Sequence, residues 1–200
     1  MGLYSPIRGD IKIKGRSIVN SSQEDKNSIL KNFGVLYQSS ALFSSLTLSE
    51  NIAMPLKEFS PLSDELISAT ASLKLSLVGL QGYENFSPSE ISGGMKKRAG
   101  LARAMALDPD ILFFDEPSAG LDPISSAELD SLILEIRDSY KSSMIIVTHE
   151  LDSIFAIADR VIILDKNTKS IIEQGDPREL KSNSRNQWVR NFLNRTGSKG

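Results

Sequence analysis

The 200-residue sequence lacks cysteine entirely, which excludes disulfide bonds and metal sites built on thiolates. It also lacks an excess of basic charge, with 23 Lys and Arg against 25 Asp and Glu, so nucleic acid is not an expected partner. No stretch approaches the roughly 18 consecutive apolar residues of a transmembrane helix. The first residues also lack the charged-then-apolar layout of a signal peptide. Any work at a membrane is therefore expected to depend on a partner protein.

What the sequence does contain is enough apolar side chain, 40% of residues with only 8 prolines, for one compact domain with a core. Residues 10–14 alternate between polar and apolar, which predicts a half-buried strand with Ile11 and Ile13 on one face. Residues 33–37 predict a short buried strand that ends at Gln38.

Helices are predicted in the middle of the chain and near its end. After a polar start at 63–65, apolar residues recur at helical spacing at Leu66, Ala69, Leu73 and Leu77. Gly93 and Gly94 begin another helix, and Ser125 with Glu128 predicts the capping box of a third. Residues 181–200 predict a polar, loosely held tail, in which a short amphipathic helix is indicated by Trp188, Val189, Phe192 and Leu193.

Three wholly apolar runs in the second half, at 111–114, 144–147 and 161–164, alternate with helical segments. Such strands are typical of a parallel sheet covered by helices on both faces. Ligands bind at the carboxyl ends of these strands. That rule directs attention to the acidic pair 115–116, which follows the first run, and to His149, the only histidine, which follows the second.

The acidic pair at the end of a buried strand resembles the Walker B element of P-loop ATPases, and this resemblance implies Mg²⁺-dependent hydrolysis. An Asp at this place can hold Mg²⁺ and the next Glu can act as a general base toward water. Taken alone, two acids after a strand more often mark a solvated strand end. The run that follows changes this reading, because residues 115–123 resemble the Walker B element and D-loop of ABC ATPases. Upstream, residues 91–95 resemble the ABC signature motif, in which Ser and Gly residues at a helix N-terminus expose N–H groups to phosphate.

This resemblance implies roles for individual residues. Asp115 would hold Mg²⁺ with Gln38, which is similar to the Q-loop glutamine. Glu116 would be the general base, and His149 resembles the switch histidine that contacts the γ-phosphate. The residues implied to bind nucleotide are Gln38, Ser92, Gly93, Gly94 and Asp122.

The resemblance also implies a fold and an assembly. It covers residues 1–180 and implies a P-loop NTPase-like α/β domain with a largely parallel sheet, a helical subdomain at about 55–107 and a remnant of an antiparallel β subdomain. Residues 93–98 are similar to the Mla-type lipid transporters of Gram-negative envelopes, since Met95 stands where most signatures carry Gln. Those systems imply ATP and Mg²⁺ as cofactors, a homodimer, and membrane permease subunits that hold it at the cytoplasmic face of the inner membrane.

The phosphate-gripping Gly-x4-Gly-Lys-Ser/Thr sequence of P-loop ATPases does not occur in these 200 residues. Residues 2–6 resemble the segment that follows the P-loop helix, so we expect Met1 to be an internal methionine, a mis-called start or the edge of an incomplete gene. Two hypotheses follow. Either the whole protein is the catalytic subunit of a lipid transporter and this chain alone is inactive, or the chain is a non-catalytic fragment or regulatory pseudo-subunit.

Overall fold

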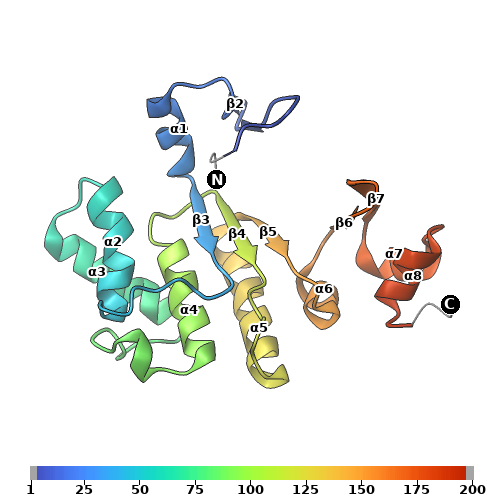
Figure 1. Cartoon of the computed structure of the whole chain (residues 1–200). Helices are drawn as coiled ribbons and strands as arrows, with labels where there is room; N and C mark the ends of the chain where they lie inside the picture. The colour runs from blue at the N-terminus through green and yellow to red at the C-terminus, as the bar shows by residue number, and fades with distance from the viewer. Residues whose placement is uncertain (1–3, 197–200) are drawn as a thin grey trace.

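The computed structural model describes residues 4–196 as an α/β fold (Figure 1). In chain order the elements are β1 (Lys12–Ile13), β2 (Arg16–Ser17), α1 (Gln23–Leu30), β3 (Phe33–Leu36), α2 (Leu48–Phe59), α3 (Asp64–Leu77), the short 3-10 helix η1 (Pro88–Glu90), α4 (Gly93–Ala104), β4 (Ile111–Asp115), α5 (Pro123–Tyr140), β5 (Ser143–Val147), α6 (Leu151–Ile157), β6 (Val161–Asp165), β7 (Ser170–Gly175), α7 (Pro177–Asn183) and α8 (Gln187–Leu193). No helix among the described residues is both long and apolar enough to cross a bilayer.

A parallel sheet in the order β3-β4-β5 forms the centre of the fold. Leu36 pairs with Phe114, and Phe114 pairs with Ile146, so the three carboxyl ends lie at one edge. The main core lies between this sheet and α2, α3, α4 and α5, and it includes the fully buried Leu36, Leu112 and Phe114. The predicted α/β class with helices flanking a parallel sheet is therefore confirmed. The residues that follow the three strands are brought together at the carboxyl edge of the sheet.

The third apolar run, 161–164, does not join the parallel sheet as predicted. It forms β6, which pairs with β7 in an antiparallel hairpin, and Figure 1 shows this hairpin beyond β5 with no strand between. Within residues 4–196 no strand pairs with the outer edge of β5 or with the second edge of β6. Large apolar side chains on β5 and on the β6–β7 hairpin are half or more exposed: Ile145, Val147, Ile162, Leu164 and Ile171. The apolar run predicted a strand correctly but could not predict its partner.

The predicted helix after residue 65 is α3, and its buried face is not the apolar stripe that indicated it. Leu66 and Leu73 are more than half exposed, whereas Ile67, Ala71 and Leu75 are buried in the core. Both sets repeat at helical spacing because α3 is apolar on two faces, so the period alone could not choose between them. The stretch 55–107 contains α3, α4 and the C-terminal part of α2, but its division from the rest as a subdomain stays a prediction.

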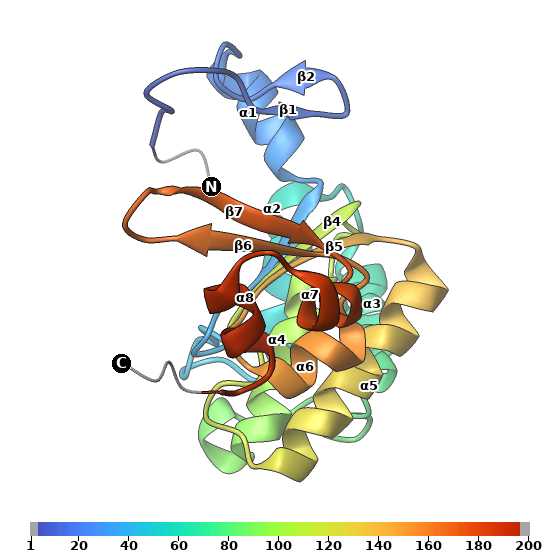
Figure 2. The ribbon, with the colours of Figure 1, turned by 90° about the vertical axis from the view of Figure 1, so that its right-hand side faces the viewer.

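The N-terminal strand is shorter than predicted. β1 covers only Lys12–Ile13, and Ile11 precedes it with half of its surface exposed. β1 pairs antiparallel with β2, which agrees with the expected remnant of an antiparallel β subdomain. Figure 2 shows β1, β2 and α1 at one end of the molecule, away from the helices that cover the sheet. An ion pair of 2.6 Å between Lys14 and Asp110 links this part to the start of β4.

The predicted loose tail is wrong over residues 187–193. This stretch forms α8, and its Val189 and Leu193 are buried against Leu151 and Ile154 of α6. The helix begins at Asn186, whose side chain accepts hydrogen bonds from two backbone N–H groups of α8. The apolar spacing had indicated the amphipathic helix, but composition gave no sign of the surface that receives it. Residues 197–200 of the predicted tail lie outside the described residues.

Candidate functional site

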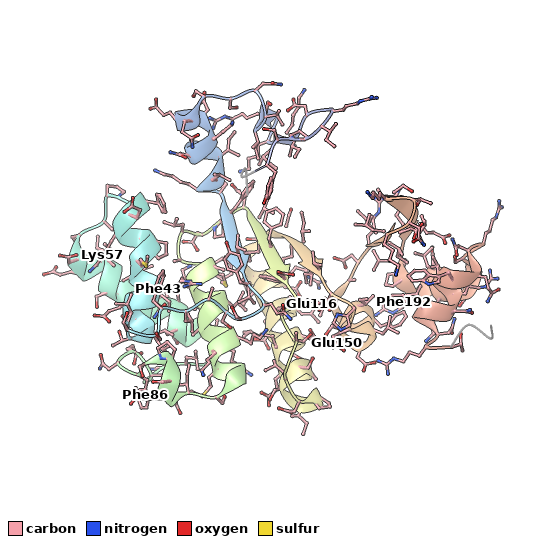
Figure 3. The ribbon with its side chains drawn as sticks, viewed as in Figure 1. Phe43, Lys57, Phe86, Glu116, Glu150 and Phe192 are labelled. Atoms are coloured by element: carbon pink, nitrogen blue, oxygen red, sulfur yellow. The ribbon has the colours of Figure 1, made fainter. Side chains whose placement is uncertain are left out.

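Glu116 lies directly after β4 in a left-handed backbone conformation, with φ of +46°. A residue other than glycine adopts this conformation at a cost, and such strain persists only where the surroundings fix it. The Glu116 N–H donates to the carbonyl of Val147 at 2.8 Å, and its carbonyl accepts from the N–H of Ala119 at 3.1 Å. The end of β5 and the following turn thus hold the Glu116 backbone, and Figure 3 shows its side chain at the strand ends.

The Glu116 carboxylate accepts a hydrogen bond from His149 Nδ1 at 2.7 Å. His149 follows β5 and is largely exposed, and the hydrogen bond and negative charge of Glu116 raise the pKa of its imidazole above the ordinary value. The second carboxylate oxygen, Oε2, is buried and has no hydrogen-bond partner among the described residues. The pair predicted from the ends of neighbouring strands is therefore in contact, with one acceptor oxygen of Glu116 still available.

Asp115 and Gln38 line one open pocket of about 500 Å³ at the same edge of the sheet. Its remaining walls come from Tyr37, Ser39, Ala119 and Gly120. No cluster of three or more His, Cys, Asp or Glu side chains able to hold a metal occurs within residues 4–196. The site offers instead one carboxylate and one amide oxygen. That hard-oxygen pair fits Mg²⁺, which keeps several water molecules and binds substrate phosphates beside a carboxylate or two.

The glycines of the signature-like motif lie in a second place. Ser92 is the N-cap of α4, and its hydroxyl accepts from the N–H of Met95 at 3.3 Å. Ser92 and Gly93 are exposed, and an added Cβ at Gly93 or Gly94 would meet only the side chains of Leu121 or Ser125 at 3.8 Å or more. These residues border the start of α5 and line none of the pocket that Asp115 and Gln38 share. The predicted site residues thus form two separate groups on one chain.

Asp122 has a structural task in the second group. It is the N-cap of α5 and accepts hydrogen bonds from the N–H groups of Ile124 and Ser125, each at 3.0 Å. The Ser125 hydroxyl donates to it as well, and these bonds lower the pKa of the Asp122 carboxyl. The capping box predicted at Ser125 and Glu128 is therefore wrong by three residues, because Pro123 follows the true cap. The expected nucleotide-binding role of Asp122 stays a prediction.

Sequence reasoning missed two cations of α4 that bind the chain after β3. Lys97 donates to the carbonyl of Gln38, and Arg103 donates to the carbonyls of Ser40 and Ala41 at 2.9 and 2.7 Å. Lysine and arginine on a helix normally point to water, so only the packing of α4 against β3 could reveal these contacts. The one signal in the sequence was a pair of glycines, Gly34 in β3 and Gly100 in α4, which permit the helix to approach the strand closely.

A wide groove of about 910 Å³ lies on the other side of this segment. It is mostly apolar, with walls from β3, α2 and the residues around Phe43, and charged side chains at its rim such as Glu50 and Lys57. Figure 3 places Phe43 and Lys57 on the side of the sheet where α2 and α3 lie. The segment 38–43 therefore has the Asp115 pocket at its start and this groove at its end.

Comparison with known protein families agrees with the fold described above. The profile described as ABC transporter covers residues 1–119, more than half of the chain. The chain belongs to the ABC transporter family. Among curated members, this ABC transporter chain is 43% identical over 194 residues to the "Probable ribonucleotide transport ATP-binding protein mkl" of Mycobacterium tuberculosis, covering 97% of the chain and 53% of that protein. It is 38% identical over 192 residues to the intermembrane phospholipid transport system ATP-binding protein MlaF of Escherichia coli, covering 96% of the chain and 70% of MlaF.

Solved ABC structures share its fold. CbiO1 of Clostridium perfringens, described as part of the ABC transporter complex cbiONQ, superposes with a TM-score of 0.82 at 25% identity, covering 91% of the chain and 71% of cbiO1. The predicted ABC ATPase fold is thereby confirmed. The chain spans about half the length of mkl, the curated relative with 43% identity.

Proposed function

We propose that the protein is the ATP-hydrolysing subunit of an ABC transporter. The observation that carries the proposal is the convergence of Gln38, Asp115, Glu116 and His149 at the carboxyl ends of three adjacent parallel strands. Parallel sheets bind their ligands at this edge. An Mg²⁺ ion held by Asp115 and Gln38 would neutralise charge on the phosphates of ATP. The likeness to mkl and MlaF, both named as ATP-binding transport proteins, supports the same assignment.

In this proposal Glu116 is the general base. Its hydrogen bond to His149 fixes one carboxylate oxygen, and the second, Oε2, has no partner among the described residues but is closed to solvent. The proposal therefore requires that nucleotide binding admit the attacking water to Oε2, which would then accept its proton. The strained backbone at Glu116 sets the direction of the side chain. The largely exposed His149, whose pKa is raised by Glu116, would donate from its other ring nitrogen to a phosphate oxygen in place of the Glu150 carboxylate, which lies 3.8 Å from that nitrogen. The exposed Asp115 is left for the metal.

The test of this assignment is Glu116→Gln in the whole protein. We expect ATP binding to persist and Mg²⁺-dependent turnover to fall about 100-fold or more, because a general base typically contributes 10² to 10⁴. Glu135→Gln is the matched control, since Glu135 is exposed on α5 and does not line the pocket of Asp115 and Gln38. Turnover of Glu116→Gln at the wild-type rate would refute the base. The 200-residue chain alone is expected to be inactive.

We propose that the protein works as a homodimer. The signature-like group around Ser92 and the catalytic group around Glu116 lie apart on one chain, with no shared pocket. A second copy related by a two-fold axis would bring the Ser92 end of α4 to the nucleotide held at the Glu116 group of its partner. The exposed N–H groups at the start of α4 suit a phosphate there. Nucleotide binding by Ser92, Gly93 and Gly94 is thus proposed to occur in trans.

Membrane permease subunits are the proposed partners of the groove beside Phe43. The groove is apolar with a charged rim, which suits a short helix from another protein. It would place the subunit at the cytoplasmic face of the inner membrane. Arg103 connects the two regions, since it binds the carbonyls of Ser40 and Ala41 and lines this groove.

For the transported substrate, the likeness to MlaF supports phospholipid or a related hydrophobic solute. The likeness to mkl supports ribonucleotides as the second candidate. Vesicles that contain the whole transporter would decide, by ATP-dependent movement of labelled phospholipid or of labelled ribonucleotide. If the whole protein shows no Glu116-dependent turnover, the remaining hypothesis is a non-catalytic regulatory pseudo-subunit.

A further inference from the structure

The Lys97 side chain lies inside the molecule, with 5% of its surface exposed, on the second turn of α4. A buried ammonium is costly unless hydrogen bonds replace its water. Its Nζ donates to the carbonyl of Gln38 at 2.6 Å and to the carbonyl of Glu116 at 3.2 Å. Burial lowers the pKa of Lys97, while the negative charges of Glu116 and Asp115 oppose that shift. One side chain of α4 therefore joins the ends of β3 and β4.

Both carbonyls belong to segments in unusual backbone conformations. Glu116 itself is left-handed, and shortly after Gln38 the chain passes through left-handed Ser40 and Ala41, with φ of +62° and +47°. Such conformations are kept only where neighbouring groups fix them. The Ser40 and Ala41 carbonyls are held by Arg103, two turns further along α4. The Glu116 carbonyl has one backbone donor, the Ala119 N–H, in addition to Lys97.

Lys97 is also close to the signature-like residues. It lies on the same rigid helix as Gly93 and Gly94, about one turn away. The N-terminus of α4 has no contact of its own with the pocket of Asp115 and Gln38. Any rotation of α4 relative to the sheet must therefore stretch the bonds from Lys97 to Gln38 and Glu116.

We infer that Lys97 is a positioning residue, which fixes the backbones of Gln38 and Glu116 relative to the signature end of α4. This inference rests on the proposed function, because it assigns to Lys97 the alignment of two groups. One is the general base Glu116, which acts on the nucleotide of its own subunit, and the other is the N-terminus of α4, which contacts the nucleotide of the partner subunit. The ammonium acts through the two carbonyls and touches no substrate.

The kinetic test compares Lys97→Met, Lys97→Arg and Lys96→Met in the whole protein. Methionine fills the buried space without a donor, so we expect kcat to fall about 10- to 100-fold, the scale of a misplaced catalytic group, with KM for ATP within about twofold. Arginine keeps a donor and should recover kcat to within about threefold of wild type. Lys96→Met makes the same change at a side chain whose ammonium has no hydrogen bond within the described part of the chain, and it should leave both constants unchanged. An unaltered kcat in Lys97→Met overturns the inference.

Hydrogen exchange of backbone amides supplies a readout that does not need turnover. In Lys97→Met, the amides of 38–43 and 116–121 should exchange at least about 10-fold faster, while those of α3 and α5 keep their protection. Equal loss of protection throughout the molecule would mean a merely structural role and would overturn the inference. Wild type and Glu116→Gln in the same ATPase assay test the proposed function separately. If wild type has no activity, the exchange pattern still decides the role of Lys97.

Discussion

Asp130 is a second buried ionisable group, and no part of the proposed chemistry uses it. Its Oδ2 accepts from the Ser153 hydroxyl at 2.8 Å, and its Oδ1 has no partner among the described residues. Burial raises the pKa of the Asp130 carboxyl, against the lowering effect of Ser153 and with some help from the charge of Asp152. The folded state therefore binds this proton more tightly than the unfolded state does. Ionisation of Asp130 weakens the fold as the pH rises from the unfolded pKa to the folded pKa, and the loss is constant above that.

Asp130→Asn should consequently stabilise the protein at neutral pH. The change removes a buried charge but keeps an oxygen for Ser153, so we expect the midpoint of thermal unfolding at pH 7 to rise by roughly 2–4 °C. The advantage should shrink as the pH falls from the raised folded pKa toward about 4, the ordinary pKa of an unfolded aspartic acid, because the unfolded state then also begins to bind the proton. Thermal scans between pH 4 and pH 8 measure it. Glu135→Gln, an exposed change on the same helix, should have no effect, and a gain for Asp130→Asn that is equal at every pH would contradict the prediction.

The sequence could locate Glu116 and His149 because their positions follow from strand ends alone. Parallel strands place their carboxyl ends together, and both residues come two positions after the end of an apolar run. It could not locate Lys97, since adjacent lysines on a helix read as solvated charge. The sequence did carry a signal for Asp122 as the cap of α5, because Pro123 follows it and proline favours the first helical position. The sequence could therefore predict contacts that follow from the order of parallel strands, but not contacts that depend on how a helix packs against the sheet.

At the scale of elements, α4 and β3 approach so closely that two glycines are required. A Cβ at Gly34 would lie 2.1 Å from the carbonyl oxygen of Ala104, and a Cβ at Gly100 would lie 2.8 Å from Leu36 Cδ1. Because the Gly34 contact is with backbone, the helix itself would have to move. This contact fixes the distance from α4 to the sheet and hence the reach of Lys97 and Arg103.

Gly34→Ala should therefore destabilise the fold by about 1–3 kcal/mol, the usual cost of overpacking. Denaturant unfolding measures the loss directly. Gly93→Ala is the matched control, because Gly93 is in the first turn of the same helix and its added Cβ meets only Leu121 at 3.9 Å. Comparable losses in the two variants would show that the close contact of α4 with β3 is not the cause.

The elements themselves were predictable in kind but not in pairing or orientation. The apolar runs at 111–114 and 144–147 became neighbouring parallel strands, whereas the equally apolar 161–164 paired with β7. An apolar run predicts a buried segment or a strand. The neighbour with which that strand pairs depends on the path of the chain between the strands. In the same way α3 was indicated by the spacing of Leu66 and Leu73, which point outward.

At the scale of the whole molecule, the two separate groups of site residues predict an ATP-dependent homodimer. Ser92→Arg should abolish turnover and leave nucleotide binding by the single subunit nearly unchanged, because the new side chain fills the phosphate site of the partner. Titration of nucleotide and steady-state turnover measure the two effects. Mixing Ser92→Arg with Glu116→Gln puts both lesions into one composite site of a heterodimer, so the other site can regain activity. If Ser92→Arg destroys binding by the isolated subunit, the motif acts in cis and the dimer proposal fails.

The unpaired edges of β5 and β6 have a consequence for the protein in the crowded cell. Each edge presents a row of backbone N–H and C=O groups beside exposed apolar side chains such as Val147 and Leu164. Such rows recruit strands from neighbouring chains, which is how aggregates begin. Described residues 4–196 contain no strand that covers them. The solubility of these residues thus depends on whatever covers both edges first, and during synthesis a chaperone would compete with aggregation for them.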